Sequence, residues 1–432
     1  MLHAVKISKG EATFCSRYVK TYKHVTERKT GHPIFQSVFS SFNNGLMATM
    51  ARCLLTAVRI LSGHYNPMAN GFGPANTSLA LFSGKLFALC ESDLPYEIKL
   101  TPDGDIITLG RRTLNNERIL NMTAHPKIDL DTGEVVAFSY NIMRPFLTYL
   151  RISSDGREQK EVPIFSMKRA SFVHDFAVTK NYAIFPDLQI VIDAMEIMRG
   201  RSPVRIDASK TPRLGFIPRY ASDESRMCWV DVPGLNMLHV VNAWEEEDDD
   251  GGKIVIVASN VLPIEHALDR MDLVHSSLEK ITIDAEANKL VTRFPISAKT
   301  LDFGVINPQY AGKNNRYVYA AVTDPAQKVA GVMKLDLSLT VADPITASRM
   351  YGPGCYGGEP FFVPREADNP DADEDDGYLI TYVHNEYTEK SRFIVMDAKS
   401  TNLDIIADVT LPARVPYGFH GIFVKEKDLN NL

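Results

Sequence analysis

The sequence contains little cysteine, no excess of basic residues and no apolar run long enough to span a membrane. Its five cysteines are odd in number and far apart, which suits free thiols in a reducing compartment and argues against a disulfide framework. The formal net charge of −6 argues against nucleic acid as a partner, because phosphate binding requires a basic face. The first thirty residues contain no apolar core of the kind that a signal peptide has.

The length of 432 residues allows two or three average domains or one large repetitive domain. Most of the chain consists of short β-branched and aromatic runs divided by turn signals such as serine-glycine and aspartate-glycine pairs. Clear examples are residues 78–89, 134–142, 253–259 and 377–383. This pattern predicts an all-β fold, either a sandwich, a barrel or a propeller.

Four histidines in apolar or turn contexts favour the propeller among these folds. They are His125, His174, His239 and His420, and dozens of residues separate each from the next. This spacing excludes a zinc finger, whose ligands come in close pairs. It fits a closed fold in which separate units each send one side chain to a common axis. Seven blades would take about 60 residues each, above the usual 40 to 45, so we expect helices and long loops to cap one face.

Residues 46–61, LMATMARCLLTAVRIL, interrupt the β pattern and predict a helix. Sixteen residues span about 24 Å, which is less than the ~30 Å hydrocarbon core of a bilayer, and Arg52 and Arg59 interrupt the apolar run. Two interpretations stay open. The helix lies in a membrane or lipid-droplet interface with its apolar face down, or it packs on the core of the propeller.

Two acidic runs, at 245–252 and 366–377, carry enough carboxylates to suggest calcium binding. The regular spacing of an EF-hand, with its glycine and terminal glutamate, is missing from both. We therefore expect both runs to be solvated turns.

The four histidines form a candidate metal site, although each one alone is more commonly a core or surface residue. Four neutral imidazoles suit zinc, copper, iron or nickel, and composition does not choose among these metals. Ligating imidazoles usually donate their second N–H to a carboxylate. Glu91, Asp302 and Glu359 stand in apolar or turn contexts that make them candidates for this role, and the alternative is that they are structural or surface carboxylates.

Several stretches resemble the carotenoid cleavage dioxygenases over essentially the whole chain. They are TAHPKID (123–129), FVHDFAVT (172–179), HVVNAWEE (239–246), GGEPFFVPRE (357–366) and VPYGFHG (415–421). Two further stretches, RYVKTYK (17–23) and ESDLPYE (91–97), are similar to the plant type 4 members in particular.

The resemblance implies a single seven-bladed β-propeller domain over residues 1–432, with non-haem Fe²⁺ bound on its axis. The implied iron ligands are His125, His174, His239 and His420, and the implied carboxylates behind them are Glu91, Asp302 and Glu359. The implied reaction adds O₂ across one conjugated double bond of a carotenoid or apocarotenoid and gives two carbonyl products. We expect cleavage at the 9,10 (9′,10′) bond, with 7,8 and 11,12 cleavage open. A non-catalytic lipid-binding propeller is the alternative from another class.

The chain departs from the family pattern in two ways. Asp302 stands where most of the family has glutamate, so a side chain one methylene shorter has to reach its histidine. Relatives also carry a plastid transit peptide and further residues ahead of the segment that matches Met1, so we expect this chain to lack the family's N-terminal segment. The resemblance implies a plastid location, in the chloroplast and its plastoglobules.

Overall fold

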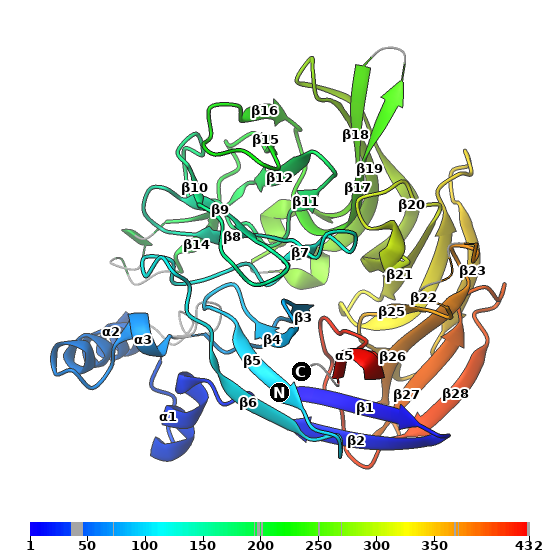
Figure 1. Cartoon of the computed structure of the whole chain (residues 1–432), viewed down its shortest axis with the longest axis horizontal. Coiled ribbons are helices and arrows are strands. Elements are labelled where there is room, and N and C mark those ends of the chain that lie inside the picture. The colour runs from blue at the N-terminus through cyan, green and yellow to red at the C-terminus, as the bar shows by residue number, and fades with distance from the viewer. Residues whose placement is uncertain are drawn as a thin grey trace.

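The computed structural model describes residues 1–35, 46–71, 73–193, 195–196, 199, 202–248, 251–268, 270–366, 369 and 371–429. Within these residues most secondary structure is antiparallel sheet. The sheets follow one another around a common centre in chain order, which is the arrangement of a β-propeller (Figure 1). The all-β propeller predicted from strand density is confirmed, and the division into seven blades stays a prediction.

Five separate sheets contain the first half of the chain. The first is the hairpin of β1 (Leu2–Ser8) and β2 (Glu11–Arg17). The second consists of β3 (Ser78–Phe82), β4 (Lys85–Leu89), β5 (Tyr96–Leu100) and β6 (Ile106–Arg111). The third consists of β7 (Lys127–Ile128), β8 (Val135–Tyr140), β9 (Leu147–Ile152) and β10 (Val162–Ile164). The fourth consists of β11 (Ala177–Val178), β12 (Tyr182–Asp187), β15 (Arg213–Pro218) and β16 (Cys228–Asp231), and a small sheet pairs β13 (Ile190–Ile192) with β14 (Val204–Ile206).

The second half forms one continuous hydrogen-bonded path, because single strands pass from one unit to the next. The path begins with β17 (Met237–Asp248), β18 (Gly251–Leu262), β19 (His275–Asp284) and β20 (Lys289–Val305). It continues through β21 (Tyr317–Thr323), β22 (Val329–Asp336), β24 (Cys355–Gly357), β26 (Gly377–Asn385), β27 (Lys390–Asp397) and β28 (Ile405–Thr410), with β23 (Ile345–Met350) beside β22 and β25 (Phe361–Pro364) beside β26. The first part of β20 pairs with β19, whereas its end pairs with β21.

The turn between β3 and β4 shows how a serine-glycine pair in the sequence marks the boundary between two strands. Phe82 pairs with Lys85, so only Ser83 and Gly84 form the loop, and both have positive φ, at 51° and 68°. Positive φ at both central residues matches the twist of a two-residue hairpin, and glycine adopts it at no steric cost. In β3 the burial alternates along SLALF, as a half-buried strand requires.

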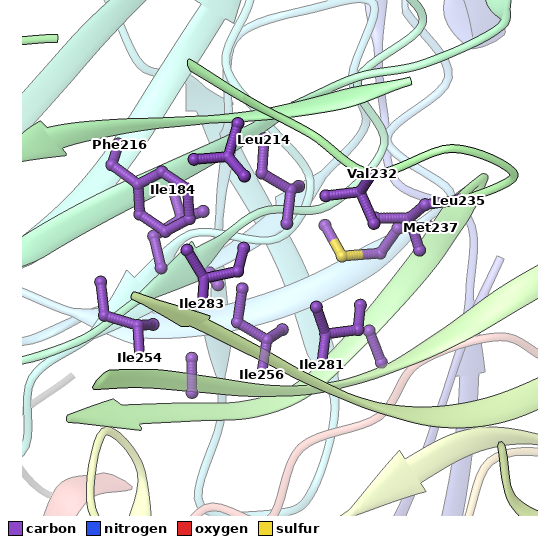
Figure 2. Close-up of a cluster of buried hydrophobic side chains, with 14 residues drawn as sticks. Ile184, Leu214, Phe216, Val232, Leu235, Met237, Ile254, Ile256, Ile281 and Ile283 are labelled. Carbon is purple, nitrogen blue, oxygen red and sulfur yellow. The ribbon is translucent and has the colours of Figure 1, made fainter. Parts of the chain in front are cut away.

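The hydrophobic core lies between neighbouring sheets. In the cluster of Figure 2, Ile184 of β12 and Leu214 and Phe216 of β15 face Ile256 of β18 and Ile281 of β19, and all are almost fully buried. Burying an aliphatic side chain of this size contributes about 1.5–3 kcal/mol. Each sheet therefore packs against the next through its own apolar face, and this packing fixes the positions of the sheets around the centre.

Among the described helices, those before β3 project from this ring of sheets, whereas the short C-terminal helix lies inside it, near β1 and β26 (Figure 1). These helices are α1 (Tyr22–Thr30), α2 (Leu46–Leu61), α3 (Pro67–Asn70) and α5 (Glu426–Leu429), with short 3-10 turns at Ile264–His266, Met271–Leu273 and Pro308–Tyr310.

The predicted helix at 46–61 is confirmed as α2. Its described side chains do not pack on the core, since Leu54 is 66% exposed and Leu61 87% exposed. The core-packing interpretation is therefore wrong for residues 54–61. Among the described helices, none is both long enough and apolar enough to cross a bilayer.

The prediction of solvated turns was wrong for most of the first acidic run. Glu245 to Asp248 continue β17, and Glu245 pairs with Ile254 and Glu246 with Lys253 of β18. Backbone pairing in a projecting hairpin does not require apolar side chains, so periodicity gave no strand signal there. Residues 249–250 lie outside the described residues.

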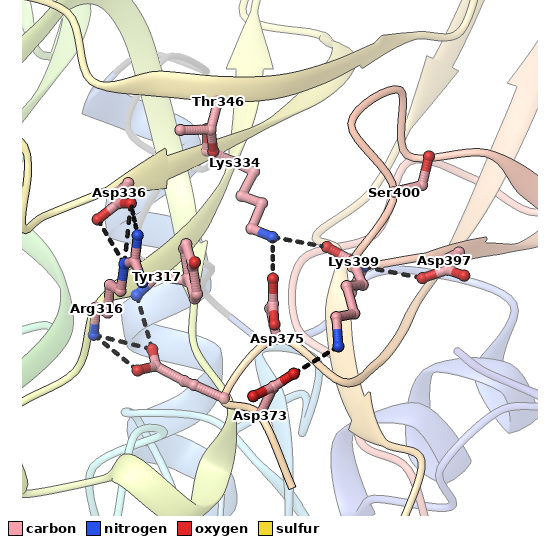
Figure 3. Close-up of polar contacts among 12 residues, drawn as sticks. Arg316, Tyr317, Lys334, Asp336, Thr346, Asp373, Asp375, Asp397, Lys399 and Ser400 are labelled. Carbon is pink, nitrogen blue, oxygen red and sulfur yellow. Dashed lines mark hydrogen bonds and ion pairs between the residues drawn. The ribbon is translucent and has the colours of Figure 1, made fainter.

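The second acidic run is also more than a solvated turn. Asp375 is buried and lies 2.6 Å from the ammonium of the equally buried Lys334 (Figure 3). The Glu374 carboxylate accepts the backbone N–H groups of Arg316 at 2.9 Å and Tyr317 at 2.7 Å. The run therefore ties the start of β26 to β21 and β22. The sequence did not reveal this because Lys334, the partner of Asp375, lies 41 residues away.

Candidate metal centre

The four predicted histidines lie together at the centre of the sheets. His239 belongs to β17, His125 and His174 precede β7 and β11, and His420 follows β28. One ring nitrogen from each lies within 4.8 Å of the other three. The Nε2 atom of His174 is 3.2 Å from that of His125 and 3.3 Å from that of His239. Four distant segments thus bring their imidazoles to one point, as the propeller geometry predicts.

Each of the three predicted carboxylates lies behind one histidine. Glu91 Oε1 is 2.6 Å from His174 Nδ1, Asp302 Oδ1 is 2.9 Å from His239 Nδ1, and Glu359 Oε1 is 3.0 Å from His420 Nδ1. The aspartate at 302 therefore reaches its histidine despite its shorter side chain. A register shift in β20 just after Asp302 gives the local backbone room to adjust.

A second contact fixes the orientation of each carboxylate. Thr77 Oγ1 donates to Glu91 Oε2 at 3.0 Å. Ser276 Oγ donates to Asp302 Oδ2 at 3.3 Å. The backbone N–H of Gly421, next to His420, donates to Glu359 Oε2 at 3.2 Å. These contacts hold the imidazoles in place through both oxygens of each carboxylate.

The electrostatics of the pair formed by His239 and Asp302 favour a charged carboxylate. Burial raises the pKa of Asp302, but the charge and hydrogen bond of His239 outweigh it and lower the pKa to about 2. Burial lowers the pKa of His239, and Asp302 more than compensates, so the pKa is raised above its ordinary value. An ionised carboxylate only accepts hydrogen bonds, so His239 donates through Nδ1–H and its neutral form carries the lone pair on Nε2.

Burial and neighbouring charges also shift the pKa values of Glu91 and His125. Burial raises the pKa of Glu91, and the hydrogen bond and charge of His174 lower it below its ordinary value. His174 therefore also donates through Nδ1. Burial, followed by repulsion from the other three imidazoles, lowers the pKa of His125 well below its ordinary value, so His125 is neutral.

These protonation states leave nitrogen lone pairs facing one another. With Nδ1–H of His174 and His239 donated to carboxylates, the neutral form of each ring carries its lone pair on Nε2, and these two atoms lie 3.3 Å apart. Two acceptors at this distance repel each other unless a cation binds between them. A neutral imidazole set suits a transition-metal ion. The residues present therefore fit a metal centre of the type that the sequence predicts.

Two aromatic side chains next to the centre were not predicted. The ring of Phe303 lies 5.0 Å from that of His239 and 5.6 Å from that of His420. Phe172 stacks on His174 at 6.1 Å. Phe303 has φ of 48°, which is rare for a bulky residue and is a form of backbone strain found at functional sites. Its position directly after Asp302 is the only sequence signal that could have found it.

A groove of about 1030 Å³ borders one histidine–carboxylate pair. His420 and Glu359 form part of its lining, and the lining as a whole is mostly apolar. All of β1 also lines it, and β1 pairs only with β2 among the described strands. The centre is therefore bordered by apolar space on the side of the chain's two ends.

The fold and the centre together define a β-propeller built around a histidine cluster suited to a metal ion. The family model described as retinal pigment epithelial membrane protein (RPE65) matches residues 1–425. The chain therefore belongs to this family, that of the carotenoid oxygenases.

Curated relatives from plants match the chain over most of its length. The chain is 57% identical to the probable carotenoid cleavage dioxygenase 4, chloroplastic, of Arabidopsis thaliana, with 100% of this chain and 72% of the relative covered. It is 50% identical to the 9-cis-epoxycarotenoid dioxygenase NCED1, chloroplastic, of Oryza sativa subsp. japonica, with 100% and 68% covered. It is 52% identical to the zeaxanthin 7,8(7',8')-cleavage dioxygenase, chromoplastic, of Crocus sativus, with 83% and 97% covered.

Solved structures share the fold. The lignostilbene dioxygenase of Pseudomonas brassicacearum superposes with a TM-score of 0.79 at 23% identity, covering 96% of this chain and 85% of that one. A mutant of the Synechocystis apocarotenoid oxygenase gives a TM-score of 0.78 at 24% identity, covering 98% and 86%. At these identities the likeness concerns the fold alone.

Proposed function

We propose that this chain is a non-haem Fe²⁺ dioxygenase that cleaves a conjugated double bond of a carotenoid or apocarotenoid with O₂ and gives two carbonyl products. The observation that carries the proposal is the convergence of four imidazoles in a member of this family. In it, His125, His174, His239 and His420 hold the iron, and Glu91, Asp302 and Glu359 orient three of these ligands.

Each part of the centre has a chemical task in this proposal. Fe²⁺ held by these imidazoles would supply Lewis-acid chemistry for the activation of O₂. The carboxylates keep the proton of each imidazole on Nδ1, so that Nε2 stays free to bind. Phe303 and Phe172 shield the imidazoles from water, which protects reactive species next to a hydrophobic polyene. Since both oxygen atoms enter the products, no reducing cosubstrate is consumed.

For the bond, we propose cleavage at 9,10 (9′,10′). A relative from Arabidopsis thaliana at 38% identity is named a carotenoid 9,10(9',10')-cleavage dioxygenase. Cleavage at 7,8 is the second candidate, because the Crocus sativus relative named for that bond is 52% identical. Cleavage at 11,12 of an epoxycarotenoid is the third, given the similarity to a 9-cis-epoxycarotenoid dioxygenase.

The test is product identification with purified protein loaded with Fe²⁺ under anaerobic conditions and then exposed to O₂. β-Carotene, zeaxanthin, a short apocarotenal and a stilbene are supplied in separate reactions, and the products are identified by chromatography and mass spectrometry. We expect paired carbonyl products from a carotenoid or apocarotenoid, with masses that report the bond. Consumption of the stilbene alone, or of no substrate by iron-loaded protein, would overturn the proposal.

We further propose that the protein acts in a plastid and rests on a membrane or plastoglobule surface through α2. Relatives are named chloroplastic or chromoplastic. The apolar side chains of Leu54, Leu55, Val58 and Leu61 are exposed on α2, as an interfacial helix requires. Replacing Leu54 and Leu55 by aspartate should release the protein from vesicles of plastid-type galactolipids. The matched control replaces another exposed adjacent pair, Ile405 and Ile406 of β28, and unchanged partitioning of the Leu54 and Leu55 variant would contradict the proposal.

A further inference from the structure

One of the four histidines lacks the support that the other three have. His174, His239 and His420 each donate Nδ1–H to a carboxylate. Within the described part of the chain no carboxylate contacts the ring of His125, and the one contact that fixes its backbone is the bond from its N–H to Thr123 Oγ1 at 3.0 Å. Since an imidazole that ligates a metal has to be held in position, another group is expected to anchor the His125 segment.

Asp175 contacts the segments of three histidines at once. It directly follows His174 in the chain. Its Oδ1 lies 2.7 Å from the ammonium of Lys127, two residues after His125. Its Oδ2 accepts the backbone N–H of Val240, the residue after His239, at 2.7 Å. Asp175 is only 2% exposed, so these contacts form in a low-dielectric environment.

The neighbours of Asp175 restrict its geometry further. The backbone N–H of Phe176 donates to Asp175 Oδ1 at 2.7 Å. The ammonium of Lys127 also lies over the ring of Phe176, 5.8 Å from its centre. Asp175 thus accepts two backbone N–H groups and pairs with one cation, and this set satisfies both carboxylate oxygens. A charge held in this way has one favourable position, so the three segments around it keep a fixed spacing.

We propose that Asp175 is a positioning residue that sets the mutual distance of His125, His174 and His239, and that Lys127 transmits this restraint to His125. The pair formed by Lys127 and Asp175 does for the His125 segment what Glu91, Asp302 and Glu359 do for the other three rings. The proposal rests on the metal centre of the proposed function.

The experiment compares variants that remove the contacts in steps. Asp175→Ala removes all of them. Asp175→Asn keeps an oxygen for the Val240 N–H but removes the charge that Lys127 binds. Lys127→Met keeps the aliphatic stem and removes only the ammonium. Lys85→Met is the matched control, because Lys85 makes an ion pair of similar length, 2.8 Å to Glu97, far from the centre.

The readouts are Co²⁺ binding to the metal-free protein and the visible absorption of bound Co²⁺, which reports ligand geometry. The melting temperature of the metal-free protein is measured in parallel. We expect the Kd for Co²⁺ to rise about 10- to 100-fold in Asp175→Ala, as for other groups that orient metal ligands. The rise should be smaller in Asp175→Asn and Lys127→Met, each with an altered Co²⁺ spectrum, and absent in Lys85→Met.

Two results would overturn the inference and are distinguishable from each other. If the Asp175 and Lys127 variants bind Co²⁺ with unchanged affinity and spectrum while His239→Ala loses binding, Asp175 is structural only and the metal centre stands. If His239→Ala binds Co²⁺ as well as the unchanged chain does, the metal centre itself fails, and the inference fails with it. Should Asp175→Ala not fold, the Asp175→Asn and Lys127→Met variants decide the question alone.

Discussion

Two buried groups of ionisable side chains in this chain differ in how their hydrogen-bonding capacity is used. Around Lys334 and Asp375, every charge meets an opposite charge or a backbone group, and the Lys334 ammonium also donates to the Ala398 carbonyl at 3.2 Å (Figure 3). At the histidine centre, the carboxylates bind the Nδ1 side of the rings, and the Nε2 lone pairs of His174 and His239 face each other.

The difference separates a structural cluster from a functional one. A buried ion pair with satisfied partners holds strands together and has no capacity left for a ligand. Converging Nε2 atoms have that capacity, because their lone pairs can bind a cation. Substitutions around Lys334 and Asp375 should therefore lower stability and leave metal binding intact. Substitutions at the histidine centre should lower metal affinity and leave the stability of the metal-free protein largely unchanged.

The largest expected effect is that of His239→Ala. Removing a direct ligand should lower metal affinity by more than the ~10- to 100-fold expected for an outer partner and should abolish turnover. Metal content after anaerobic Fe²⁺ loading measures it. His384→Ala is the control, because His384 is also buried but bonds Ser391 at 3.0 Å and is not one of the four clustered histidines. Equal iron content in the two variants would contradict the comparison.

Asp375→Ala should have the largest effect on stability. It leaves the ammonium of Lys334 buried without its counter-charge, which costs about 3–5 kcal/mol. Denaturant unfolding of the metal-free protein measures this loss. The iron bound per folded chain should not change. Asp373→Ala, which removes only the exposed partner of Lys399, should leave unfolding unchanged. Loss of iron binding in folded Asp375→Ala would remove the distinction between the two clusters.

Asp302→Ala should lower metal affinity less than His239→Ala does, and its effect should be confined to the metal centre. Without the carboxylate, His239 loses the partner that keeps its proton on Nδ1, so metal affinity and kcat should fall about 10- to 100-fold. Asp302→Glu keeps a carboxylate on a side chain one methylene longer and should recover part of the loss. A metal titration followed by turnover measurement checks both variants. Wild-type affinity in Asp302→Ala would show that Asp302 does not orient His239.

The smallest effect concerns pH. Metal binding requires neutral imidazoles, so protons compete with the ion as the pH falls. Because the pKa of His239 is raised above 6.5, this competition begins near neutral pH. The rise in melting temperature produced by the metal should therefore be larger at pH 7.5 than at pH 5.5. Calorimetry of loaded and metal-free protein at both values measures it. An equal rise at both pH values would contradict the assignment of His239 as a ligand.

The sequence predicted the features that depend on local pattern and on short motifs. Alternating apolar residues and turn pairs located the strands, and the contexts of the four histidines and of Glu91, Asp302 and Glu359 identified the residues that the structure brings together. Their mutual distances depend on how whole sheets pack, which no local pattern contains.

What the sequence did not reveal depended on partners far away in the chain or on backbone geometry. Asp175 is adjacent to His174, but its contacts with Lys127 and Val240 appear only when three sheets meet. Phe303 lies beside two histidines and has a positive φ that its residue type does not predict. The acidic runs read as solvated turns, because the pairing of Asp375 with Lys334 is not visible from composition.

The most direct test of the central claim is a crystal structure of the iron-loaded protein with anomalous scattering measured at the iron edge. The claim predicts one iron peak per chain, within bonding distance of the Nε2 atoms of His125, His174, His239 and His420. A peak elsewhere, or one that leaves any of these four imidazoles uncoordinated, would contradict it.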